Sequence, residues 1–236
     1  LRAILPVDML GCPVNEEGLE DFLNEFPLTV IRDSAEALGS SVNKRMVGNS
    51  DYLSCFSFNG NKIITTGGGG MITTNNKEFA DQLRHITTTA KSDAVFFNHD
   101  KIGFNYRLVN VLASIGIAQI KKLESFIKKK QEIHQIYKDN LHLIDIELFE
   151  VPKKVNSNYW LNLITFKEDI IKKEPLEDIV AYFASKRIQV RPLWTPMSML
   201  PMYSNNFSDN LDVTYDLWRR SLCLPSSTGI SEEELD

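Results

Sequence analysis

Residues 57–72 read SFNGNKIITTGGGGMI and place a single lysine, Lys62, shortly before four consecutive glycines. The phosphate-binding loop of nucleotide enzymes has the opposite order, with its lysine after the glycines, so the spacing excludes that motif. A flexible linker is disfavoured because strand-forming residues, 63–66 and 71–74, flank the glycines on both sides. The stretch therefore predicts a tight turn of residues 67–70 between adjacent strands, with at least one glycine at positive φ.

The composition is typical of an ordinary globular protein, with 43% hydrophobic and 24% charged residues in a chain of 236. The 31 acidic and 26 basic residues give a net charge of −5. This balance argues against nucleic acid or an anionic membrane as the main partner. No apolar run approaches the roughly 18 residues that cross a bilayer. Three scattered cysteines predict a cytoplasmic protein, and four histidines without ligand spacing predict no metal site.

Strand and helix patterns alternate along the first half of the chain. Predicted strands cover residues 2–7, 28–31, 53–58 and 71–74, and helices follow Asn15 and either Asn75 or Asn76 as capping residues. This order predicts an α/β domain with a largely parallel sheet. From about Val109 the apolar period predicts one or two long helices. We expect a solvated face there, formed by Lys121, Lys122, Lys128, Lys129 and Lys130.

The second half predicts a smaller α/β unit. A polar connector over residues 151–158 precedes a strand (159–166), a helix (176–187) and a further strand (188–191). We therefore expect one domain over residues 1–120, and the connecting helix with a C-terminal domain over 121–236. Residues 231–234 have the S-x-x-E spacing of a helix start, which predicts that the chain is part of a larger protein.

Asp33 and Lys62 together favour a pyridoxal 5′-phosphate (PLP) site. Lysine amines condense with carbonyl groups, and PLP is the commonest such partner. Its site also needs a carboxylate for the pyridine nitrogen and hydroxyl or N–H groups for the phosphate. Asp33 ends an apolar strand, where open sheets place ligand groups, and Ser57 precedes Lys62 by five residues. Taken singly, the aspartate is more often a helix cap and the lysine a surface residue.

Several segments resemble the DegT/StrS family of PLP-dependent sugar aminotransferases. Residues 33–40 (DSAEALGS) resemble the family's D-x-A-[QE]-x-x-G motif, and residues 57–62 (SFNGNK) its S-F-x-x-x-K segment. Residues 103–107 (GFNYR) resemble G-[YF]-N-[YF]-R, and 191–196 and 224–226 resemble later segments. The resemblance implies a type I PLP-dependent transferase fold, as part of the large mixed-sheet domain followed by a smaller C-terminal α/β domain. The chain has no counterpart of the family's N-terminal third.

The resemblance also implies roles for individual residues. Lys62 would form the Schiff base with the cofactor and shuttle a proton between cofactor and substrate, while Asp33 would pair with the pyridinium nitrogen. Glu36 would approach the phenolic oxygen of the ring, either protonated or turned away, because an ionised glutamate would repel it. Ser57 would bind the phosphate, and Asn105 would reach the phosphate of the other subunit in a homodimer. Substrate contacts are expected from Tyr106, Arg107, Arg191 and Ser198.

Within the family, NGNKIITTGGGGM is most similar to enzymes that aminate UDP-linked 4-keto-6-deoxy-N-acetylhexosamines. The leading hypothesis is thus transfer of an amino group from glutamate to C4 of a 4-keto-6-deoxy nucleotide sugar in glycan biosynthesis. A dehydratase branch carries histidine in place of the lysine, so Lys62 argues against it. A non-catalytic module that dimerises or regulates remains the alternative from another class.

Overall fold

The computed structural model describes residues 1–93, 95–141, 144, 146–231 and 233–235. The chain forms two compact units. The first comprises Leu1–Lys128 and Val151–Trp160, and the second Lys129–Glu150 and Leu161–Asp236. Residues 151–160, which were predicted to follow the connecting helix into the second domain, return to the first unit.

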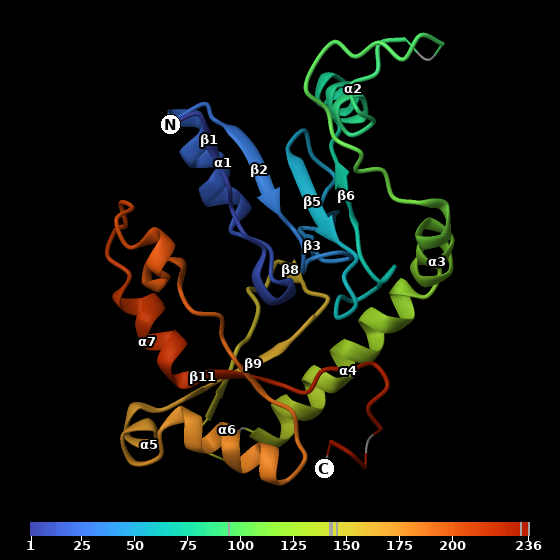
Figure 1. Cartoon of the computed structure of the whole chain (residues 1–236). Helices are drawn as coiled ribbons and strands as arrows, with labels where there is room; N and C mark the ends of the chain where they lie inside the picture. Colours follow the sequence, from blue (N-terminus) through green and yellow to red (C-terminus); the bar gives the residue numbers. More distant parts are fainter. Residues whose placement is uncertain (94, 142–143, 145, 232, 236) are drawn as a thin grey trace. The chain divides into compact units, whose positions relative to one another are not determined.

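A four-stranded sheet forms the centre of the first unit, in the order β1-β2-β5-β6 (Figure 1). The first three of these strands are parallel, and β6 runs antiparallel to β5. The expected parallel sheet therefore has one reversed strand. The bounds are β1 (Ala3–Ile4), β2 (Thr29–Asp33), β5 (Leu53–Ser57) and β6 (Gly70–Thr73).

The glycine-rich stretch connects β5 directly to its antiparallel neighbour β6. Gly67 (φ 82°) and Gly69 (φ 83°) adopt left-handed backbone, which confirms the prediction of a positive φ in this turn. Gly70 itself opens β6 and faces Ser57 in the register. A Cβ atom at Gly70 would lie 2.3 Å from the carbonyl oxygen of Phe56, so the two strands approach too closely for any side chain there.

Four helices belong wholly or partly to the first unit: α1 (Glu16–Glu25), α2 (Lys77–Ile86), α3 (Asn110–Ile120) and α4 (Leu123–Leu141). Asn15 caps α1, and of the two candidates for α2 it is Asn76 whose side chain accepts a hydrogen bond, from the N–H of Phe79 (3.1 Å). The two long helices predicted from the apolar period are α3 and α4. None of the side chains of α3 is buried in this chain.

The predicted polar connector contains a strand. β8 (Val155–Asn156) pairs with β3 (Ser41–Val42), which also pairs with β4 (Arg45–Met46). Its pairing brings residues 157–160 into the first unit. A hydrophobic cluster in this unit gathers around Phe56, Phe58 and Ile64, and Leu123 and Phe126 of α4 pack against it.

The second unit has an antiparallel sheet in the order β10-β11-β9-β7. The predicted strand at 188–191 is displaced, since β10 covers Arg191–Pro192. A cluster that includes Ile164, Val190 and Leu222 forms the core. The bounds are β7 (Ile146–Leu148), β9 (Asn162–Phe166), β11 (Ser221–Leu224), α5 (Glu168–Lys173), α6 (Leu176–Ser185) and α7 (Asp212–Arg220), with short 3-10 turns at Met197–Met199 and Pro201–Tyr203.

Lys130 corrects the expectation of a uniformly solvated lysine face. It is 6% exposed, and its Nζ donates a hydrogen bond to the carbonyl oxygen of Ser226 at 2.6 Å. Burial lowers the pKa of this amine to about 8. Ile133 and His134, one turn further along α4, are buried as well. The side chain therefore belongs to the apolar stripe of the helix rather than to its charged face.

Candidate functional site

Lys62 lies in the connection that follows β5, and its side chain is 12% exposed. Its backbone N–H donates to the carbonyl oxygen of Asn59 (3.1 Å), which closes a turn just before the lysine. The Nζ atom is 3.5 Å from Oε1 of Glu36 and 3.9 Å from the ring centroid of Trp160. The amine therefore lies between a carboxylate and an indole face.

Glu36 is held with its carboxylate toward Lys62. Its Oε2 atom accepts a hydrogen bond from the backbone N–H of Leu10 at 2.6 Å, and Leu10 adopts a left-handed φ of 58° in the short 3-10 turn Met9–Gly11. Burial raises the pKa of Glu36, and the hydrogen bond from Leu10 and the charge of Lys62 offset this only in part. The raised pKa makes the protonated form of Glu36 more accessible than that of an exposed glutamate.

Asp33 is the last residue of β2, at the carboxyl end of the parallel strands. Its backbone is fixed on one side by Pro6, whose carbonyl accepts from the N–H of Asp33 (2.9 Å), and by Asp8, whose N–H donates to the carbonyl of Asp33 (2.9 Å). Its carboxylate accepts from the N–H of Ala35 (3.1 Å), and its charge adds to the raised pKa of Glu36. The structure thus gathers Asp33, Glu36 and Lys62 at one edge of the sheet.

A buried ion network lies directly behind this edge. Asp8 is fully buried and accepts hydrogen bonds from Nε of Arg32 (2.8 Å) and from the hydroxyl of Ser34 (2.7 Å). Arg32, 2% exposed, also donates to Glu16 at 2.8 Å. Because Arg32 and Ser34 are the neighbours of Asp33 in the chain, the network fixes the backbone that presents Asp33. No sequence motif predicted this role for Asp8 or Arg32.

Two predicted phosphate ligands lie in different places. Ser57 ends β5, and its hydroxyl accepts a hydrogen bond from the N–H of Asn59 (3.3 Å) at the start of the lysine turn. Asn105 forms a bridge with Thr88, just after α2. Since β5 and β6 are antiparallel, the lysine turn lies where β6 begins, and α2 follows at the opposite end of β6. The chain then turns back toward the start of β6, since a Cβ at Gly69 would lie 2.7 Å from the side chain of Leu108, three residues after Asn105.

The four residues that were expected to contact substrate are divided between the two units. Tyr106 is 73% exposed and its ring stacks on Phe104, with centroids 5.0 Å apart, and Arg107 next to it is exposed too. The other two lie in the second unit. There Arg191 faces Cys223 across the β10–β11 pair, and the hydroxyl of Ser198 is 3.0 Å from that of Tyr215.

Trp160 and Asn158 also belong to the site, although nothing in the sequence predicted it. The indole N–H of Trp160 donates to the carbonyl of Asn61 (2.8 Å), which is 99 residues away in the sequence, and Asn158 donates to the carbonyl of Glu36 (2.8 Å). Neither residue belongs to a motif with recognisable spacing. The pairing of β8 with β3, for which the sequence has no recognisable signal, brings residues 157–160 to the lysine.

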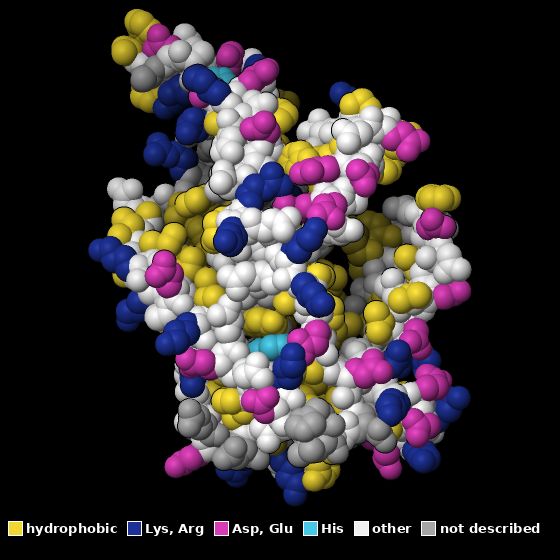
Figure 2. Space-filling view, turned by 180° about the vertical axis from the view of Figure 1, so that it is seen from behind, with side chains coloured by type: hydrophobic (Ala, Val, Ile, Leu, Met, Phe, Trp, Pro, Cys, Tyr) yellow, Lys and Arg dark blue, Asp and Glu magenta, His cyan; other side chains and the backbone are white. Residues whose placement is uncertain are grey.

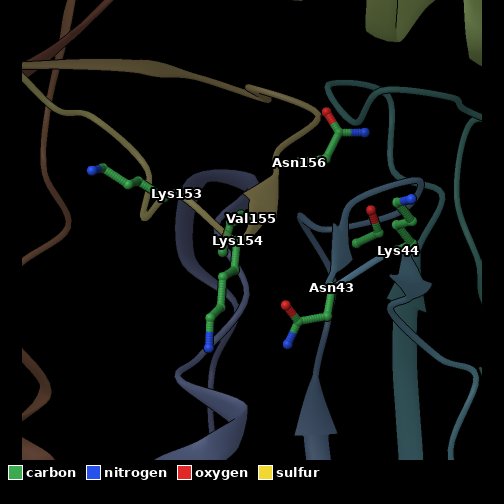
Figure 3. A pocket seen from close by; sticks show the side chains of 7 residues that line it. Asn43, Lys44, Lys153, Lys154, Val155 and Asn156 are labelled. Carbon is green, nitrogen blue, oxygen red and sulfur yellow. The ribbon is translucent and has the colours of Figure 1, made fainter.

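A groove of about 480 Å³ lies elsewhere in the first unit, and Lys62 is not among its lining residues. Its lysines do not converge, because Lys44, Lys153 and Lys154 point in different directions (Figure 3). Lys154 in addition pairs with Glu17. Among the residues described, no cluster of three or more metal-ligating side chains occurs. The helices of the described ranges include none that is both long and apolar enough to cross a membrane.

Comparisons with known proteins find relatives along the whole chain. The profile of the DegT/DnrJ/EryC1/StrS aminotransferase family matches residues 1–236. GDP-perosamine synthase of Escherichia coli O157:H7 is 36% identical over 234 residues, 99% of this chain and 63% of that protein. UDP-4-amino-4,6-dideoxy-N-acetyl-beta-L-altrosamine transaminase of Campylobacter jejuni (strain 81-176) is 31% identical over 182 residues, 75% of this chain and 48% of that protein.

Among solved structures, Helicobacter pylori PseC, an aminotransferase of pseudaminic acid biosynthesis, superposes with a TM-score of 0.89 at 25% identity. The match covers 99% of this chain and 64% of PseC. The predicted α/β fold of the PLP-dependent aminotransferases is thereby confirmed. The chain spans about three fifths of the length of the relatives that it matches along its whole sequence.

Aminotransferases of this family depend on PLP. The residues present fit that cofactor. The amine of Lys62, the carboxylate of Asp33 at the end of β2 and the hydroxyl of Ser57 are the kinds of group that PLP needs. A Cβ atom added at Gly67 or Gly68 would meet nothing within 4 Å. The glycine turn therefore leaves its backbone open to a phosphorylated group at residues 67 and 68.

Proposed function

The chain belongs to the DegT/DnrJ/EryC1/StrS aminotransferase family, and on this premise we propose that its protein transfers an amino group from glutamate to C4 of a 4-keto-6-deoxy nucleotide sugar. One observation carries the proposal: the amine of Lys62 lies 3.5 Å from Glu36, at the sheet edge where Asp33 ends β2. PLP would supply an electron-withdrawing ring that stabilises negative charge on the carbon losing a proton.

The residues of this chain would bind the cofactor and move the proton. Lys62 would hold PLP covalently and carry the proton at its Nζ atom, with Glu36 beside it as the group that orients the amine. Asp33 would keep the ring nitrogen protonated, a role that suits a carboxylate whose backbone is bonded to Pro6 and Asp8 on one side and paired with Cys55 of β5 on the other. Ser57, next to the lysine turn, would bind the phosphate.

The substrate class is supported by the relatives. Their names describe one protein that makes GDP-perosamine and others that act on a UDP-linked altrosamine, and both products are nucleotide-linked amino sugars. We extend to this chain the feature that they share, a nucleotide sugar that receives an amino group. Tyr106, Arg107, Arg191 and Ser198 are the residues that we propose to contact it.

A homodimer would complete the site. Val111, Ile117 and Ile120 of α3 are 50% or more exposed, as are Phe96 and Phe97 of the hairpin that precedes it. Figure 2 shows hydrophobic side chains at the tip of this projecting hairpin. Such a surface fits a second copy of the chain, because aromatic and aliphatic side chains are typical of the cores of homodimer interfaces. Asn105, which is exposed in the segment between α2 and α3, would then reach the phosphate of the partner subunit.

Two substitutions test the roles of Lys62 and Asp33. Lys62→Ala should abolish turnover and the visible absorbance that PLP gains on binding covalently, and borohydride should no longer fix the cofactor to the chain. Asp33→Asn should keep the covalent link and lose most of the rate, because a neutral amide stabilises the protonated pyridine far less. A wild-type protein that binds no PLP would instead support the non-catalytic module.

Mixing subunits tests the composite site. Lys62→Ala and Asn105→Ala chains are each expected to be nearly inactive alone. If Asn105 acts on the partner's phosphate, a mixed dimer contains one intact site, and activity should rise above that of either variant. Subunit exchange is verified by mass spectrometry of differently tagged chains. No gain in activity despite exchange would contradict the composite site.

A further inference from the structure

Trp160 contacts the lysine segment at two points. Its indole ring lies 3.9 Å from Nζ of Lys62, measured to the ring centroid. Its indole N–H donates to the carbonyl of Asn61, at 2.8 Å, and Asn61 directly precedes the lysine. One side chain, 3% exposed, thus holds both the ammonium and the backbone that carries it.

Trp160 is itself fixed by the segment that presents Glu36. The side-chain oxygen of Asn158 accepts from the backbone N–H of Trp160 (2.8 Å), and its amide donates to the carbonyls of Glu36 (2.8 Å) and Leu38 (2.9 Å). Asn158 is fully buried. At Gly11 a Cβ would lie 2.0 Å from the oxygen of Asn158, so this close approach requires a glycine. The indole, Asn158 and Glu36 therefore form one connected arrangement around the lysine.

This arrangement gives the ammonium a defined direction. A lysine side chain has four rotatable bonds. Proton transfer between its amine and one carbon atom becomes slower when the amine samples many orientations. The face of an indole attracts a cation more strongly than other aromatic rings do. With Glu36 at 3.5 Å as its second partner, the amine is bounded by a carboxylate and by a ring.

We propose that Trp160 is a positioning residue for Lys62, whose indole face orients the amine and whose N–H fixes the lysine turn through Asn61. This inference rests on the proposed function, because only there does the direction of the amine affect a rate. A tryptophan that merely fills space would make the protein less stable when replaced, without a selective effect on kcat.

Nuclear magnetic resonance tests the contact without any cofactor. In protein containing ¹³C-labelled lysine, the ε-CH2 signal of Lys62 is identified by its loss in Lys62→Arg. Ring current should place this signal upfield of that of Lys77, whose side chain is 88% exposed. Trp160→Leu should remove the upfield shift, whereas Trp160→Phe should keep it because a ring face remains. A wild-type Lys62 signal at the position of Lys77 would overturn the proposal.

Kinetics test the consequence. Trp160→Leu should lower kcat by about 3- to 30-fold, the factor that corresponds to a cation–π contact, with both KM values within about twofold of wild type. Trp160→Phe should recover most of kcat, and the loss that remains measures the hydrogen bond to Asn61. Trp218→Leu, on α7 of the second unit, is the matched control and should change neither kcat nor the Lys62 signal.

The outcomes separate this inference from the proposed function. A raised KM with unchanged kcat would overturn the positioning role, because Trp160 would then contact substrate. If Trp160→Leu does not fold, the wild-type signal and the kinetics of Trp160→Phe decide. If the wild type shows the upfield signal and no transamination, the contact stands and the proposed function fails.

Discussion

Two regions of the first unit are organised in opposite ways. Around Lys62, polar side chains from distant parts of the sequence bind one another, and Asp8, Arg32 and Asn158 are almost completely removed from solvent. Around α3 and the hairpin before it, apolar side chains are exposed and local hydrogen bonds hold the backbone, such as that from the N–H of Thr89 to the carbonyl of Phe104 (3.0 Å). The first region is held together by contacts within this chain, and the second presents a surface suited to association.

The difference fits the roles that we propose for the two regions. A site that directs a proton needs fixed groups before the substrate arrives, and buried charge networks supply this at a high desolvation cost. An apolar surface needs no internal partner, since a second chain can bury it. Perturbing the first region should therefore change the free energy of unfolding, and perturbing the second should change association.

The largest effect is expected at Arg32. Arg32→Met removes the cation from the network and leaves the fully buried Asp8 without its ion-pair partner, which should reduce the free energy of unfolding by about 3–5 kcal/mol. Chemical denaturation measures this value. Arg84→Met, at an exposed pair with Asp81, is the control and should cost less than about 0.5 kcal/mol. Equal losses at the two positions would remove the distinction between the regions.

Sequence reasoning succeeded where the signal was local. The caps at Asn15 and Asn76 and the left-handed glycines lie within a few residues of what they control. The motifs brought Asp33, Glu36 and Lys62 into one hypothesis, and the fold places them at one sheet edge. Their chemical roles stay predictions.

What sequence reasoning missed depends on contacts between distant residues. Asp8 meets Arg32 24 residues later, and Trp160 reaches Asn61 across 99 residues. A short polar strand such as β8 has too few residues to show an apolar period. Lys130 was misplaced because charge alone indicates an exposed face, while its long stem lets the amine reach the carbonyl of Ser226.

The second largest effect should appear in association. Val111 and Ile115 are one helical turn apart on α3 and are 71% and 41% exposed. Glutamine forms helices at least as well as valine or isoleucine and removes apolar surface, so after replacing both residues the dissociation constant of a homodimer should rise by about 100-fold or more. Analytical ultracentrifugation measures it, and the unfolding of the monomer should change little. If the dissociation constant is unaltered, α3 is outside the interface.

A smaller effect is expected in the glycine turn, where two neighbours form a matched pair. Gly67 has a φ of 82°, Gly68 has no left-handed φ, and at both a Cβ would meet nothing within 4 Å. Gly67→Ala should cost about 1–2 kcal/mol of unfolding free energy through backbone strain alone. Gly68→Ala should be neutral or stabilise by up to about 1 kcal/mol. Equal changes in unfolding free energy for the two variants would mean that the turn changes its backbone conformation to accept alanine at residue 67. The region around Lys62 would then be less rigid than its contacts imply.

The smallest effect concerns the pH dependence of stability at Glu36. Burial raises the pKa of this carboxyl in the folded protein, so the folded state binds the proton more tightly than the unfolded chain does. Its contribution to stability is then fully present below the ordinary pKa of glutamate and is lost as pH rises through the folded value. Glu36→Gln should remove this slope, and its amide oxygen still accepts from the N–H of Leu10. Urea denaturation over a pH series measures it, with the exposed Glu78→Gln as control. A steeper fall in the variant would mean that Lys62 holds Glu36 ionised, and that the carboxylate acts on the amine as a fixed charge.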